Sequence, residues 1–297
     1  MNHVDCQELI KAFGRYPVAR FAVVDGAHFD DIATELSSIQ LSGEPLFLSD
    51  MGDGAELSGP WLVTLPDWEA ANRVLTLVGD LPAVAFWSWP DGKRALYNHL
   101  RRLNMVEIPI DDYNPDFPDW DRVIFRHADP NVMANTLSVL EEDQFAKVLG
   151  NAAALVMYAP DFGDLQEAPR LEHKVEIPKG PLRFEIEQIE AMDQNNWIQL
   201  KTRALRELPV KLNRPQNEAR EQVADAFERA KDYGLETKDQ IWTFIGFDIT
   251  YGQRFELTNK YSSVHLDLTD EQSTPDIRIH DAGKEIEAIM KGWVQNV

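Results

Sequence analysis

Two short segments of the chain combine histidine with aspartate, side chains that bind many divalent metal ions. Residues 25–31 read DGAHFDD and place His28 among three carboxylates, whereas residues 126–129 read RHAD and hold His127 and Asp129. Neither segment has the pair of histidines, four residues apart on one helix, that makes a zinc site specific. Asp25 also suits a turn, His28 the start of a helix and Asp129 a helix cap. We therefore favour structural roles for both segments and predict no metal site.

The sequence contains no other motif that supports catalysis. Cys6 is the only cysteine, which excludes an internal disulfide and a zinc site built from several cysteines. No serine lies in a nucleophile-elbow motif, and the glycine-rich residues 52–59 lack the Lys-Ser/Thr pair of a phosphate-binding loop. Carboxylates are too numerous for one pair to be chosen as acid and base. We predict no catalytic residue and no cofactor, and a surface loop at residues 49–59.

Arg126 and Asp129 lie on either side of the expected start of a helix. Asp129 suits the N-cap, since Pro130 fits the first helical position, where no amide donor is needed. We favour an ion pair in which Arg126 anchors this cap, and the alternative is that Arg126 binds a carboxylate or carbonyl of a partner. Arg101 and Arg102 point in adjacent directions on another predicted helix. One is expected to cover the surface while the other faces a sheet edge or a ligand.

Tryptophans give a further indication of binding. Trp87, Trp89 and Trp120 fall at or near predicted strand ends or in a proline-rich loop, where a ring is harder to bury than in mid-strand. Tryptophan is enriched at binding hot spots, although burial in a core is its commoner fate. The candidate partner-binding residues are therefore Trp87, Trp89, Arg101, Arg102, Arg126 and Asp129.

Charge and hydropathy exclude several classes of function. The formal net charge is −21, from 29 basic and 50 acidic side chains, and such a surface repels nucleic acid. No uncharged apolar run approaches the ~20 residues of a membrane helix, and the acidic N-terminus does not read as a signal peptide. We expect a cytoplasmic protein that binds neither nucleic acid nor membrane and has a core of ordinary size, since 44% of its residues are hydrophobic.

Short apolar strands alternate with helices through the first half of the chain. The patterns predict strands at residues 21–24, 46–48, 61–65, 83–87, 105–110, 121–126 and 153–157. Amphipathic helices are expected between them, with Asp67 and Asp129 as N-caps and Gly150 at a C-terminal stop. The alternation indicates an α/β fold with α+β character. Because some connections are too short for parallel crossovers, we expect a mixed sheet.

The composition changes after residue 160. Residues 161–181, rich in proline, glycine and charge, are predicted to be a linker with one short strand at residues 173–177. Beyond them, helical patterns cover residues 182–208, 217–233 and 238–247, with Thr237 as a cap, and a last helix ends near Trp293. The expected organisation is an α/β lobe at residues 1–160, the linker, and a helical lobe at residues 182–297.

Four segments, in this order and at this spacing, resemble one family across roughly the first half of the chain. They are RFAVVDGA (20–27), GPWLVTLP (59–66), AVAFWSWPDGKRALYNHLRRL (83–103) and FRHADPNVM (125–133). The family is that of the adaptor chaperones of bacterial type VI secretion, long catalogued as a domain of unknown function. Residues 233–256 also resemble a helical element often found toward the C-terminus of this family.

The resemblance implies a function in protein binding. Adaptors of this family bind a toxic effector and help load it on the valine-glycine repeat (VgrG) spike protein, without catalysis or a cofactor. We expect the effector to occupy a groove between two lobes, lined by residues of FWSWP, HLRR and FRHADP. Two alternatives stay open: an immunity-type protein that neutralises a toxin, and a metal-dependent hydrolase that uses His28, His127 and nearby carboxylates.

Overall fold

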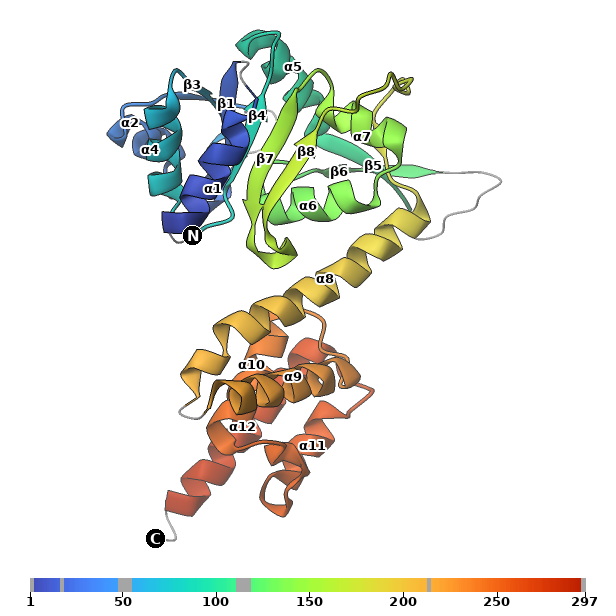
Figure 1. Cartoon of the computed structure of the whole chain (residues 1–297). Coiled ribbons are helices and arrows are strands. Elements are labelled where there is room, and N and C mark those ends of the chain that lie inside the picture. The colour runs from blue at the N-terminus through green and yellow to red at the C-terminus, as the bar shows by residue number, and fades with distance from the viewer. Residues whose placement is uncertain (1–2, 17–18, 48–54, 111–118, 213–214, 295–297) are drawn as a thin grey trace. The chain divides into compact units, whose positions relative to one another are not determined.

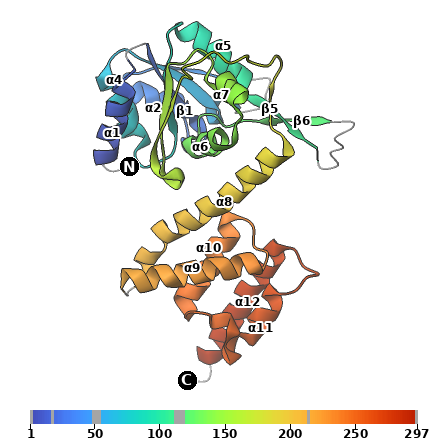
Figure 2. The same cartoon turned by 45° about the vertical axis from the view of Figure 1, so that its right-hand side comes forward.

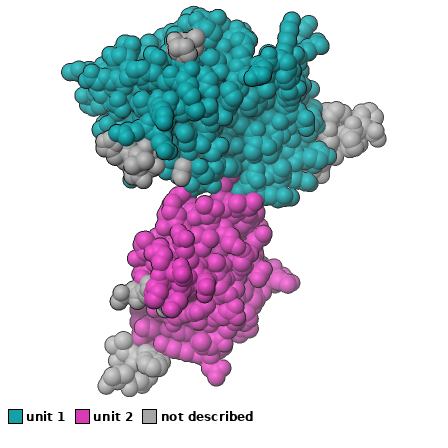
Figure 3. All heavy atoms as spheres, viewed as in Figure 1, with its two compact units in different colours: residues 1–196 teal, residues 197–297 magenta. Residues whose placement is uncertain are grey.

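The computed structural model describes residues 3–16, 19–47, 55–110, 119–212 and 215–294. By its internal contacts the chain divides into two compact units, Met1–Asn196 and Trp197–Val297, coloured teal and magenta in Figure 3. Residues 49–54 of the predicted surface loop lie outside the described residues, and the loop is wrong for residues 55–58, which form the short helix α3 (Ala55–Ser58). The strand predicted at residues 46–48 is wrong for Leu46 and Phe47, since the strand in this stretch is Gly43–Pro45. The lobe and linker boundaries expected at residues 160 and 182 stay predictions.

A six-stranded sheet forms the centre of the first unit. Its order is β2-β3-β1-β4-β7-β8, and every neighbouring pair is antiparallel. Alternate residues of a strand face opposite sides of a sheet, so Phe21 and Val23 join one core and Ala22 and Val24 another. Burial on both sides explains why this strand reads as an unbroken apolar run. The strands are β1 (Arg20–Asp25), β2 (Gly43–Pro45), β3 (Pro60–Leu65), β4 (Val84–Ser88), β7 (Ala154–Ala159) and β8 (Asp164–Pro169).

Helices cover both faces of this sheet, as Figures 1 and 2 show. One set packs on the face of Ala22 and Val24: α1 (His3–Gly14), α2 (Ile32–Ser38) and α4 (Trp68–Val78). The other set packs on the face of Phe21 and Val23: α5 (Lys93–Leu103), α6 (Pro130–Val139) and α7 (Glu142–Leu149). Two 3-10 turns, η1 (Gly26–His28) and η3 (Pro160–Phe162), follow β1 and β7.

A second sheet of three strands joins the core beneath α5. Its central strand β5 (Met105–Pro109) pairs antiparallel with β6 (Trp120–Ile124) and parallel with β9 (Leu182–Arg183). Val106 of β5 and Leu182 of β9 are buried in the same cluster as the apolar side of α5. The predicted fold class, an N-terminal α/β lobe with a mixed sheet and α+β character and a helical C-terminal part, is confirmed.

Local capping chemistry fixes the ends of several helices. Asp67 accepts a hydrogen bond from the Ala70 backbone N–H at 2.8 Å and caps α4, and Asp129 caps α6. Gly150 ends α7 with φ +56°, a conformation that favours glycine. All three caps were expected from sequence and are confirmed.

The strand predicted at residues 173–177 is wrong. Residues 171–180 form neither helix nor strand, and the strand of this stretch is β8, which pairs with β7 from Asp164 opposite Ala159 to Pro169 opposite Ala154. β8 reads DLQEAP, and Ala168 is its only described side chain that is fully buried. Backbone pairing with β7, rather than an apolar pattern, therefore defines this strand.

The second unit is helical, and α8 runs into it from the first unit. Its core includes Phe227, Phe244 and Phe255. Thr237 caps α10, as expected, and the structure adds that it does so in a capping box with Gln240. Among the described residues, no helix has the length and apolar character needed to cross a bilayer. The elements are α8 (Ile186–Glu207), η4 (Pro209–Lys211), α9 (Gln216–Asp232), α10 (Lys238–Tyr251), η5 (Phe255–Leu257), η6 (Asn259–Tyr261), α11 (Ser262–Leu268) and α12 (Pro275–Val294).

Candidate functional site

Arg126 connects two parts of the first unit that lie far apart in the sequence. Its Nη2 atom is 2.7 Å from Oδ2 of Asp25 and 3.5 Å from Oδ2 of Asp129. Asp25 ends β1 and accepts a hydrogen bond from the Ala27 N–H at 3.1 Å, which starts η1. Asp129 accepts from the backbone of α6, where it is the N-cap. One guanidinium therefore ties the end of β1 to the start of α6.

The sequence predicted the Arg126–Asp129 pair, and the structure contains it, but the nearer partner of Arg126 is Asp25. These two residues are 101 positions apart, and no local pattern points from one to the other. The shared signal is that Asp25 directly follows one predicted strand and Arg126 is the last residue of another, which puts both at strand ends. The pair gives Arg126 a structural task, and contact of Arg126 or Asp129 with a partner stays a prediction.

Burial and charge act against each other in this cluster. Burial raises the pKa of the Asp129 carboxyl, while the charge of Arg126 and the hydrogen bonds from the backbone of α6 oppose the rise. For Arg126, burial lowers the pKa, but the hydrogen bond and charge of Asp25 outweigh it, so the net shift is upward. Arg126 therefore stays a cation and offsets the negative charge that the buried carboxylates bring.

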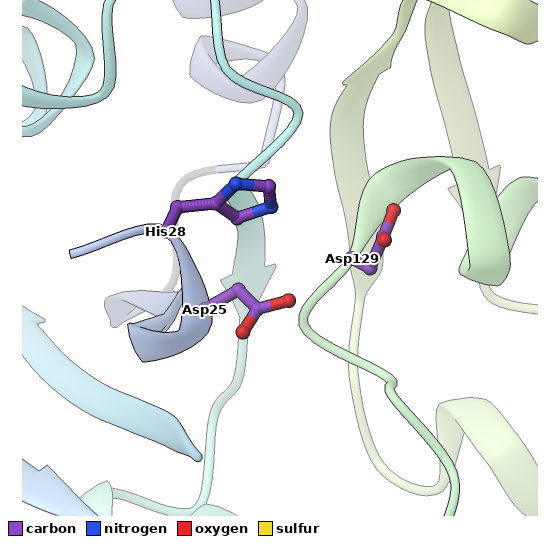
Figure 4. A group of neighbouring side chains, drawn as sticks. All are labelled: Asp25, His28 and Asp129. Carbon is purple, nitrogen blue, oxygen red and sulfur yellow. The ribbon is translucent and has the colours of Figure 1, made fainter. Parts of the chain in front are cut away.

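His28 lies beside the same two carboxylates, as Figure 4 shows. Ligand atoms of Asp25, His28 and Asp129 all lie within 4.8 Å of one another, a set that suits a divalent cation. However, Arg126 already places a fixed positive charge on both carboxylates, so a metal ion would have to displace it or meet its repulsion. The geometry therefore favours an ion-paired connection between β1 and α6 over a metal centre.

His127, the other histidine considered for chemistry, and His99 of α5 both form hydrogen bonds within the fold. His127 is fully buried with its Nε2 atom 2.9 Å from Oδ1 of Asn104, and burial lowers its pKa to about 3. His99 has its Nε2 atom 2.8 Å from the Val148 carbonyl and its ring centroid 4.9 Å from that of Trp89. Burial also lowers the pKa of His99. Both rings are therefore neutral near pH 7 and serve packing and hydrogen bonding.

The two tryptophans expected to meet a partner lie inside the first unit. Trp87 is fully buried and Trp89 is 3% exposed, both in the core beneath α5 and α7. The alternation of β4 directs Trp87 to this core, and Trp89 packs against His99. Because neither ring reaches the surface, the structure gives no support to their role as direct binding residues.

Arg101 and Arg102 are both exposed in the last turn of α5, and they face different surroundings. The Arg101 guanidinium lies 5.9 Å from the centroid of the Tyr97 ring. Arg102 lines a cavity of about 380 Å³ together with Lys147 of α7 and Lys179. Whether either arginine faces a ligand, as expected for one of the two, stays a prediction.

The far wall of this cavity is the irregular segment 177–182. The Lys147 ammonium group donates hydrogen bonds to the carbonyls of Pro178 and Pro181, each at 2.9 Å, and so holds the segment against α7. Burial lowers the pKa of Lys147. Sequence reasoning missed this feature, because residues 161–181 read only as a linker and carry no periodic pattern.

Comparison with known proteins gives one match. The model of a domain of unknown function, DUF4123, matches residues 20–147, which run from β1 into α7 and include Asp25, Arg102, Arg126 and Asp129. No curated protein and no solved structure matches the chain.

Proposed function

We propose that this chain is a cytoplasmic adaptor that binds an effector of a type VI secretion system and helps load it on the VgrG spike protein. The observation that carries the proposal is the DUF4123 match over residues 20–147. All four segments that resemble the secretion adaptors lie inside that range. The proposal includes that the chain performs no catalysis, uses no cofactor and stays in the producing cell.

The geometry of the first unit supports binding over chemistry. His99 and His127 are neutral and hydrogen-bonded within the fold, and Arg126 is held by two carboxylates. These residues stabilise a platform of two sheets, while Arg101 and Arg102 stay exposed on α5. A rigid scaffold with exposed cations at one edge suits recognition of another protein.

The proposal is tested by following an effector encoded beside this gene. A tagged copy of the chain is expected to co-purify with that effector, and deletion of the gene is expected to stop export of the effector while the spike is still secreted. Unchanged export in the deletion strain, together with no co-purification, would contradict the adaptor role.

The two alternative functions predict different results in a toxin-protection test and in metal analysis. An immunity-type protein would protect cells from the purified toxin, whereas an adaptor affects export and does not protect. A metal-dependent hydrolase would carry a stoichiometric metal ion and turn over a substrate. Metal analysis of the purified chain and of the His28→Ala variant would detect it.

A further inference from the structure

The first unit contains a basic hollow that neither the family match nor the fold assigns to a ligand. We define it as the adjoining cavities between the end of α5, α7 and residues 170–182. The central cavity, of about 380 Å³, is lined by Arg102, Lys147 and Lys179. A neighbouring one, of about 200 Å³, is lined by Arg170 and Lys174 and by His173, which lies 2.8 Å from Glu142 and is not counted among the cations. None of the described residues that line these two cavities is an aspartate or glutamate. A further adjoining cavity, of about 390 Å³, shares Lys147 and Lys179 with the central one but is also lined by Glu141, Asp143 and Glu185, so it is not part of the basic hollow.

This concentration of cations contrasts with the charge of the whole chain, which is −21. The side chains of Arg102, Arg170, Lys174 and Lys179 make no ion pair or hydrogen bond with other residues in the described part of the chain. Glu172 and Glu176 belong to the same segment but do not line either cavity. Unpaired cations around a hollow attract an anionic ligand.

The hollow is also partly apolar and has several arms. A third cavity, of about 360 Å³, reaches Asn151, and all three cavities share Gly150 and Ile177 in their lining. Leu103 and Leu182 line the central cavity, and Ile177 is 46% exposed. Asp91 in the third cavity is already engaged by the Asn151 side chain at 2.7 Å. Adjoining cavities with apolar and cationic lining suit successive side chains of a peptide better than one compact small molecule.

We propose that the basic hollow binds an extended acidic segment of the partner protein, with carboxylates at Arg102 and Lys179 and apolar side chains toward Leu103, Ile177 and Leu182. This inference rests on the proposed function, because it names the part of the partner that the adaptor recognises. An acidic peptide fits better than nucleic acid, since the net charge of the chain repels a long polyanion while the local cations attract a short one.

The test uses the purified full chain and a fluorescein-labelled peptide in which aspartate alternates with leucine. Fluorescence anisotropy is expected to show binding that weakens as salt is raised. The double variant Arg102→Glu/Lys179→Glu is expected to bind about tenfold more weakly or worse, because both contacts become repulsive. Lys147 is left unchanged, since it holds the wall of the hollow.

The double variant Lys11→Glu/Arg94→Glu is the matched control. It makes the same charge change on two exposed side chains that line none of the three cavities. Its peptide affinity is expected to equal that of the wild type. Equal losses of peptide affinity in the control and in Arg102→Glu/Lys179→Glu would overturn the inference, and so would preference for a peptide with lysine in place of aspartate or for a single-stranded oligonucleotide. Circular dichroism and urea midpoints confirm that each variant is folded.

Effector co-purification with the same variants separates the two proposals. If the wild type and the double variant capture the effector equally, the hollow is not its site and the inference fails, while the adaptor role stands. If the peptide binds in the hollow but the wild type captures no effector, the adaptor role fails and the hollow remains a site for acidic peptides.

Discussion

Arg126 acts on stability through the two carboxylates that it pairs. The side chains of Asp25 and Asp129 are 5% and 12% exposed, so without Arg126 they would carry largely buried negative charge. Arg126→Ala is expected to lower the free energy of unfolding by about 1–3 kcal/mol, less than for a fully buried pair because Arg126 is itself half exposed. The measurement is urea unfolding at neutral pH.

Arg122→Ala serves as the control for this prediction. Arg122 is 69% exposed and shares its partner Glu107 with Arg183, so its loss is expected to cost less than about 1 kcal/mol. Mild acid is expected to reduce the loss of stability caused by Arg126→Ala. Loss of the guanidinium raises the pKa of the Asp129 carboxyl further, so the folded state gains stability as the pH falls through that pKa. An equal loss of unfolding free energy in Arg126→Ala and Arg122→Ala would contradict the role of Arg126. So would a loss in Arg126→Ala that grows in mild acid.

His127 makes the first unit sensitive to acid. Burial lowers its pKa to about 3, whereas the pKa of a histidine in an unfolded chain is near 6.5. Between these values the unfolded chain binds a proton that the folded chain does not, so stability falls with decreasing pH by up to about 1.4 kcal/mol per pH unit. His127→Gln keeps an N–H donor for Asn104 but cannot titrate. Its urea midpoint is expected to fall less steeply than that of the wild type below about pH 6.5.

At the scale of elements, two helix ends have almost the same backbone and different surroundings. Gly79 ends α4 with φ +55° and ψ −120°, and Gly150 ends α7 with φ +56° and ψ −123°. A Cβ atom on Gly79 would have nothing within 4 Å, whereas one on Gly150 would lie 2.6 Å from Cε1 of His99 and 3.1 Å from Trp89. Alanine at either position therefore causes the same backbone strain, and only at Gly150 does it add a clash.

Gly79→Ala is expected to cost about 1–3 kcal/mol from backbone strain alone. Gly150→Ala should cost clearly more, because the His99 ring is held by its hydrogen bond to Val148 and cannot move away freely. Thermal or urea unfolding of the two variants side by side measures the difference. Equal losses of unfolding free energy in the two variants would mean that His99 and Trp89 can move away from the new Cβ atom. The tight packing of α5 against the end of α7 would then be refuted.

Elements defined by local chemistry were predictable, and those defined by distant contacts were not. The caps at Asp67 and Asp129 and the stop at Gly150 depend on neighbouring backbone groups, so the sequence carries their signal. β1 and β4 were found because burial on both faces makes them apolar throughout. β8 is defined by its pairing with β7, and the Asp25–Arg126 pair forms between residues 101 positions apart. Neither feature therefore produces a local pattern in the sequence. The basic hollow depends on residues 170–182, whose irregular backbone has no period to detect.

At the scale of the whole molecule, each compact unit has its own core, and no buried residue is shared between them in the described part of the chain. Leu62 of β3 and Phe244 of α10 are fully buried, one in each unit. Units with separate cores are expected to unfold separately unless their contact is large and apolar. α8 spans the boundary: Ile189 and Met192 pack against the core of the first unit, whereas Ala204 is buried in the core of the second.

Leu62→Ala is therefore expected to destabilise the first unit by about 2–5 kcal/mol, and Phe244→Ala the second by about 3–5 kcal/mol, each leaving the other unit unchanged. Native-state hydrogen exchange resolves the two effects, because amides of β1 report on the first unit and amides of α10 on the second. In Phe244→Ala, exchange should accelerate in α10 while β1 keeps its wild-type protection, and in Leu62→Ala the pattern should reverse. Accelerated exchange in both units from either substitution would show that the chain unfolds as one cooperative body, and α8 would then be the element that couples them.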